Sequence, residues 1–180
     1  WKNIADARSA DGNSQYGSIT RWDKSCAVSS SKIQIANVRS SATSVKVRIR
    51  QADGKSRFYK GYSIGAHRQI AINADKYIAK TKSGLVQIIP NKSNSAVGQT
   101  VVTYSSCNDS SVAAMHAAQI TPLRQAEPLR RNGVYNRTLS MSNMIIVSNT
   151  TNQKKTLQIK TRKQSGAFLA TKAVSVNANS

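Results

Sequence analysis

Three cations alternate along one short stretch of the chain. Lys46, Arg48 and Arg50 each follow an apolar residue, and this alternation predicts a half-buried β-strand with its cations on one face. Alternate residues on a strand lie about 6.6 Å apart, a spacing that suits the repeating anionic groups of a polymer. Arg57 and Lys60, on the next expected strand, widen this face. The sequence therefore predicts a polyanion-binding face.

The same arrangement occurs again near the end of the chain. Gln158, Lys160 and Arg162 alternate with apolar or small residues, so we expect Lys160 and Arg162 to add to the polyanion-binding residues. The alternative is a solvated sheet face, since outward strand faces are often charged and such charges oppose aggregation.

Residues for catalysis or for metal binding do not gather in this sequence. His67 and His116 fall in different expected elements, and neither has metal-ligand spacing to another His or to a Cys. The few acidic residues are scattered, so no local pair suggests general acid and base. We expect a protein that is not an enzyme, with no metal, no cofactor and no small-molecule substrate.

Charge points to the kind of partner. The 180 residues contain 27 Lys plus Arg and 7 Asp plus Glu, a formal net charge of +20. A charge this far from zero makes the folded chain repel itself and favours a polyanionic partner. The candidates are nucleic acid, an anionic glycan or an envelope surface. Base-specific recognition is not expected, because no zinc-finger spacing, basic zipper or aromatic RNA-binding signature is present.

A strand-turn-strand pattern occurs twice, 112 residues apart and without a gap. Such self-similarity indicates that one β-unit is used twice. The matching stretches are Ile33–Asn37 with Ile145–Asn149, Val45–Arg50 with Leu157–Arg162, Asp53–Gly54 with Ser165–Gly166, and Tyr62–Ile64 with Val174–Val176.

The repeat suggests two modules joined by a linker. We expect a polar arm over residues 1–20, a first β-module over 21–107, a linker over 108–133 with a short helix near 112–119, and a second module over 134–180. The second copy stops at Ser180, the position equivalent to Arg68. Either the chain is a fragment, or the second module is incomplete and takes strands from elsewhere. Trp1 in place of Met suggests a mature exported protein, with a fragment boundary as the alternative.

The pattern in Lys32–Asn37, Val45–Ile49, Asp53–Gly54 and Tyr62–Ile64 resembles the immunoglobulin-like sandwich modules of bacterial exported and surface proteins. The resemblance implies an all-β fold of tandem antiparallel sandwiches, the second incomplete, and a role in adhesion, assembly or scaffolding. In such a sandwich the first and last strands lie close together. Cys26 and Cys107, which bracket the first module, are then expected to form a disulfide, with two unpaired thiols as the alternative.

These observations favour an exported structural or adhesive protein, extracellular or on a cell surface. We expect it to assemble into a homo-oligomer or filament by β-strand complementation and to contact anionic surfaces or polymers. The alternative is a nucleic-acid-binding coat or packaging protein, since a strongly basic β-sandwich also suits a nucleic-acid container.

Overall fold

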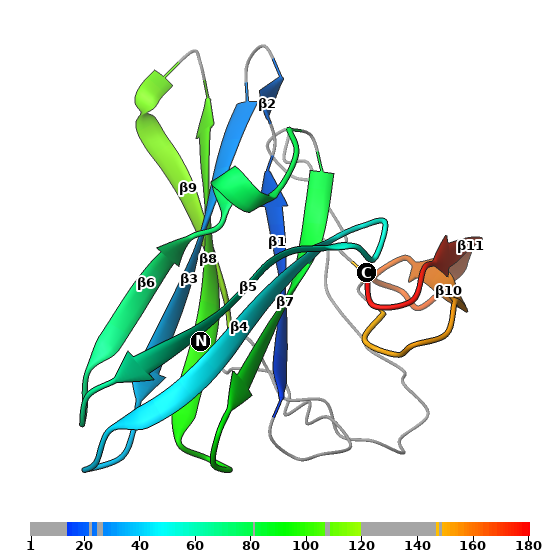
Figure 1. Ribbon diagram of the computed structural model, residues 1–180. Helices are drawn as coiled ribbons and strands as arrows, with labels where there is room; N and C mark the ends of the chain where they lie inside the picture. Colours follow the sequence, from blue (N-terminus) through cyan, green and yellow to red (C-terminus); the bar gives the residue numbers. More distant parts are fainter. Residues whose placement is uncertain are drawn as a thin grey trace.

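The protein folds as two facing antiparallel β-sheets, with a separate hairpin beside them (Figure 1). The computed structural model describes residues 14–21, 23–24, 27–80, 82–106, 109–119, 147 and 149–180. In these residues the only helix is one turn of 3₁₀-helix, η1 (Asp75–Tyr77). The all-β, antiparallel architecture predicted from the sequence is therefore confirmed.

The first sheet has four strands and carries the predicted basic face. Its strand order is β1-β7-β4-β5. The strands are β1 (Gln15–Arg21), β7 (Lys82–Pro90), β4 (Thr43–Gln51) and β5 (Ser56–Ile64).

The second sheet has β3 (Ala27–Asn37) at its centre. One edge of β3 pairs with β8 (Ala96–Ser106), which in turn pairs with β9 (Asp109–Gln119). The other edge is shared by β2 (Asp23–Lys24) and β6 (Gln69–Asn73).

The core lies between these two sheets. Alternate β-branched residues point inward from the facing strands, as strand geometry requires. Each full burial of such a side chain stabilises the fold by about 1.5–3 kcal/mol. The buried set includes Ile19, Val86, Ile88, Val45, Val47, Ile49 and Ile64 from the first sheet, and Ile33, Ile35, Ile72 and Ala96 from the second.

The separate hairpin repeats the β4–β5 hairpin residue for residue. It consists of β10 (Lys155–Arg162) and β11 (Phe168–Val176), and β11 begins and ends 112 residues after β5. Register shifts occur at Ile49/Arg50 and at Thr161/Arg162, which are again 112 residues apart. Both turns contain a glycine with positive φ, Gly54 at 79° and Gly166 at 83°.

A buried asparagine makes the same set of hydrogen bonds in each copy of the repeat. The Asn37 amide donates to the carbonyls of Ser41, Ile64 and Gly65, and its oxygen accepts from the Arg39 N–H. Asn149 makes the four equivalent bonds, each to a residue 112 positions later. The sequence repeat is thus also a repeat of hydrogen bonds.

Two sequence predictions about elements are wrong. Part of the expected arm, residues 15–20, belongs to β1, which pairs along β7. The expected helix within 112–119 is instead part of β9, which pairs with β8. In both places pairing with a distant strand overrides a weak local signal, because propensity is only a small term beside tertiary context. Of the stretch Ile145–Asn149, which matches Ile33–Asn37 in the repeat, the structure describes only residues 147 and 149.

Candidate functional site

The predicted basic ladder lies on the outer face of the first sheet. Val45, Val47 and Ile49 of β4 are buried in the core, so the residues between them point away from it. Lys46 is exposed there, whereas Arg48 and Arg50 are half-buried. The structure therefore brings the three ladder cations together on one face.

A row of side chains crosses the whole sheet at the level of Arg48. Strand register places Tyr16, Gln87, Arg48 and Tyr59 directly opposite one another on β1, β7, β4 and β5. Directly opposed residues of antiparallel strands share a face. We call these four residues the Arg48 row.

Contacts within the row hold its members in place. The Arg48 guanidinium carbon lies 4.4 Å from the centroid of the Tyr59 ring, a cation–π distance, and Tyr59 is 51% exposed. The Gln87 amide donates to the Tyr16 hydroxyl at 3.0 Å, while its oxygen accepts from Arg50 Nη1 at 3.4 Å. The result is a flat aromatic and polar surface with fixed cations.

The electrostatics of this face favour an added anion. Burial lowers the pKa of Arg50 from its ordinary value, and the neighbouring charge of Arg48 lowers it further, with Tyr16 opposing the change. Lys46 and Arg48 have no carboxylate within ion-pair distance among the described residues. The ladder thus presents positive charge that the described part of the chain does not neutralise.

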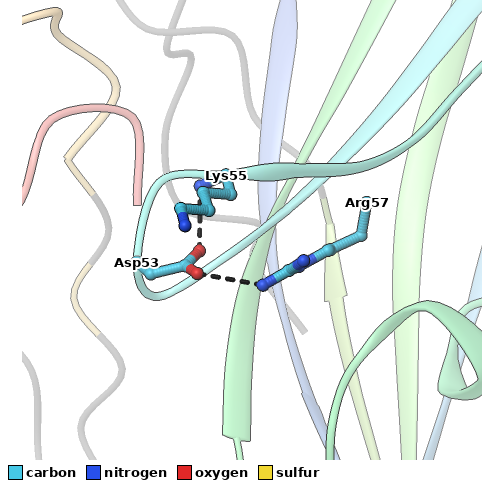
Figure 2. Close-up of polar contacts among 3 residues, drawn as sticks. All are labelled: Asp53, Lys55 and Arg57. Atoms are coloured by element: carbon cyan, nitrogen blue, oxygen red, sulfur yellow. Dashed lines mark hydrogen bonds and ion pairs between the residues drawn. The ribbon is translucent and has the colours of Figure 1, made fainter.

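The two cations predicted on β5 are placed differently from the three cations of β4. Lys60 is directly opposite Val47, which places it on the inner face of the sheet, and its Nζ lies 5.5 Å from the Tyr62 ring. Arg57 binds Asp53 at the hairpin turn through an Nη2–Oδ2 ion pair of 3.0 Å (Figure 2). Asp53 also accepts the Lys55 backbone N–H at 2.9 Å. Lys60 is thus off the ladder face, and the charge of Arg57 is paired with Asp53.

The second copy keeps two of the three ladder cations, with Gln158 at the position of Lys46, and lacks the aromatic partner. Lys160 is exposed and lies opposite Thr171, the position equivalent to Tyr59. Arg162 donates from Nη1 to the Gly166 carbonyl at 2.9 Å. The two copies therefore differ in the surface they offer to a flat ligand.

A second candidate surface is the open β10 edge, the side of β10 that faces away from β11. The equivalent strand β4 pairs with both β5 and β7, whereas β10 pairs only with β11 among the described strands. Leu157 and Ile159 are half-buried, although their equivalents Val45 and Val47 are fully buried. An open edge with apolar side chains is a site for an added strand.

Of the Arg48 row, the sequence analysis identified only Arg48 itself. Tyr59 was detectable, since the Asp53–Gly54 turn sets the hairpin register that places it beside Arg48. Tyr16 and Gln87 come to the row through the pairing of β1 with β7, which joins residues about 70 positions apart and has no local signal.

The structure describes only some of the cysteines and histidines considered in the sequence. Cys26 and Cys107 lie outside the described residues, so their pairing stays a prediction. His67 is exposed in a loop. Across the described ranges no three His, Cys, Asp or Glu side chains gather closely enough to bind a metal ion, and no helix has the length and apolar content to cross a membrane.

Comparison with known proteins adds little to this description. No protein-family model matches the chain, and no curated protein matches it either. A solved structure described as the crystal structure of Thermotoga maritima 1070 is similar in part, with a TM-score of 0.46 and 16% identity, covering 64% of this chain and 94% of that one. A likeness this weak supports no argument about function.

Proposed function

We propose that the protein is a non-enzymatic, exported structural or adhesive protein that binds an anionic polymer or surface through its basic ladder. The observation that carries this proposal is the group of Lys46, Arg48 and Arg50 on one sheet face, unneutralised by the described residues, with Arg48 and Arg50 held by neighbouring side chains. Their strand spacing fits a polymer with regularly placed anionic groups.

Assembly is the second part of the proposal. We infer that the chain consists of two immunoglobulin-like modules in tandem, and that the second is completed by a strand donated from a partner to the open β10 edge. The support is the residue-for-residue likeness of the two hairpins, only one of which has its neighbouring strand among the described residues. Main-chain hydrogen bonds would give such a complex its affinity.

Removing the ladder charges tests the binding proposal. The triple variant Lys46→Gln/Arg48→Gln/Arg50→Gln should lose most of its affinity for heparin at low salt. For a short single-stranded DNA, the slope of log K against log salt should fall by about 2, because three cations no longer displace counterions. Fluorescence anisotropy at several salt concentrations measures both effects.

A matched variant separates the ladder from the overall charge. Lys32→Gln/Lys76→Gln/Lys92→Gln removes the same charge from exposed residues that lie off the first sheet's outer face. This control should bind almost as wild type does. Equal losses in the two triple variants would show that only net charge matters and would contradict a defined ladder site.

Nucleic-acid packaging is a second candidate, because one observation favours it. Tyr59 is half exposed beside Arg48, and an aromatic ring among cations is a platform on which a base can stack. The same titrations distinguish the two functions. If Tyr59→Ser weakens binding to single-stranded DNA and leaves heparin binding unchanged, the nucleic-acid function is favoured; no selective effect favours the glycan or surface function.

A further inference from the structure

The two copies touch each other through different surfaces. A Cβ added to Gly54, in the β4–β5 turn of the first copy, would meet the carbonyl oxygen of Ala178 at 2.6 Å. Ala178 follows β11 in the second copy, and Figure 1 shows the β10–β11 hairpin beside the β4–β5 turn. A cavity of about 210 Å³ at this contact is lined by Ala52, Ser83 and Gly84 of the first copy and by Val147, Val174–Asn177 and Ser180 of the second.

Each surface has a counterpart in the other copy. We call residues 52–54 and 164–166 the turn surfaces, and residues 65–68 and 177–180 the loop surfaces. The internal contact joins the turn surface of the first copy to the loop surface of the second. Because the copies are equivalent residue for residue, the remaining two surfaces have the same backbone design.

Burial at equivalent positions confirms which surfaces are in use. Gly54 is half-buried and would clash on gaining a Cβ, whereas Gly166 is exposed and would meet nothing within 4 Å. Ala178 is half-buried and Ser180 is buried, whereas Ala66 and Arg68 are exposed. The turn surface of the second copy and the loop surface of the first are therefore open.

The free surfaces also keep the backbone conformation of the used ones. Gly166 has the same positive φ as Gly54. His67 and Asn179 have φ values of 52° and 53°, and each donates its N–H to the carbonyl at the equivalent place, Arg39 or Thr151. The open pair therefore presents the backbone conformation of the internal pair, with different side chains: Arg68 stands at the position of Ser180.

We propose that chains associate head to tail. The turn surface of the second copy in one chain contacts the loop surface of the first copy in the next chain. A contact between two different surfaces is heterologous, so repeating it builds a ring or an open filament. The partner is thus a second copy of this chain. The inference rests on the assembly part of the proposed function and specifies a contact other than the open β10 edge.

Cysteine cross-linking between two variants tests this contact. Ala66→Cys and Ser165→Cys each change an exposed residue. The two variants, carrying different affinity tags, are mixed and treated with a short bismaleimide. We expect a cross-linked dimer that contains both tags. Wild-type chains treated alike account for any reaction of Cys26 and Cys107.

The control pair uses a cysteine on a different exposed surface. Ala79→Cys lies after η1, outside both surfaces, and its mixture with Ser165→Cys should yield no mixed dimer. Light scattering of the wild type should also show a mass that rises with concentration, and Ala66→Arg should abolish that rise. Absence of the mixed dimer, or equal yields from the two mixtures, would overturn the proposed contact.

The head-to-tail contact and the proposed function can each fail while the other stands. The ladder residues lie outside the turn and loop surfaces, so we expect Ala66→Arg to retain heparin binding. If a donated strand binds the open β10 edge but Ala66→Cys and Ser165→Cys do not cross-link, the head-to-tail contact fails while strand complementation stands.

Discussion

At the scale of single residues, the two buried asparagines explain why the repeat preserves its geometry. Asn37 is 2% exposed and Asn149 is 5% exposed, and each amide ties the turn after one strand to the end of the hairpin. A hydrophobic or smaller side chain would leave three carbonyls and one N–H without these partners. Buried polar groups left unpaired are costly, so asparagine is the residue that this corner requires.

Replacing Asn37 tests this role. Asn37→Ala should lower the free energy of unfolding by about 3 kcal/mol, since several buried polar groups lose their partner at once. Urea denaturation measures the change. Asn152→Ala, at an exposed position in the second copy, is the control and should change the free energy by less than about 0.5 kcal/mol.

The same substitution in the second copy should act locally. Asn149→Ala should speed hydrogen exchange in β10 and β11 and leave the exchange of β4 and β7 unchanged, because the second hairpin pairs with no strand of the two sheets. Faster exchange throughout the molecule would contradict the view that this hairpin opens on its own.

At the scale of elements, the central feature is that β10, unlike β4, has a pairing partner on only one side among the described strands. In the first copy β7 pairs with β4 so that Val45 lies opposite Pro90, Val47 opposite Ile88 and Ile49 opposite Val86. A strand added to β10 in the same register would place its apolar side chains beside Leu157 and Ile159. The sequence of β7 is therefore the natural template for the donated strand.

A peptide with the sequence of residues 82–90 tests the open edge. It should bind the intact chain and protect the backbone N–H groups of β10 from hydrogen exchange, with a scrambled peptide as the control. Leu157→Lys places a charge where the apolar side chains of the added strand would pack, so it should weaken that binding. Binding of the scrambled peptide to the same extent would contradict a strand-specific site.

Local patterns predict some elements well and others poorly. The Asp53–Gly54 turn and the alternation in residues 44–50 identify the β4–β5 hairpin, because its pairing is local and its turn chemistry is specific. The Ala-rich stretch at 112–119 misleads, since its strand state comes from pairing with β8. The ladder cations were predictable for the same local reason, whereas Tyr16 and Gln87 depend on contacts distant in sequence.

At the scale of the whole molecule, charge and assembly are linked. Each chain carries a formal net charge of +20, so chains repel one another until counterions or a polyanion reduce that charge. Binding of an anionic polymer at the ladder should therefore promote the association of chains. A short oligosaccharide that spans one chain is enough for this effect, since it acts by neutralising charge.

Sedimentation velocity with a short heparin oligosaccharide tests this link most directly. The wild type should change from a slow species to faster-sedimenting assemblies as the oligosaccharide is added at low salt, and the Lys46→Gln/Arg48→Gln/Arg50→Gln variant should not. A wild type that remains a single-copy species at saturating oligosaccharide, or a triple variant that assembles equally well, would contradict the claim that the basic ladder connects binding to assembly.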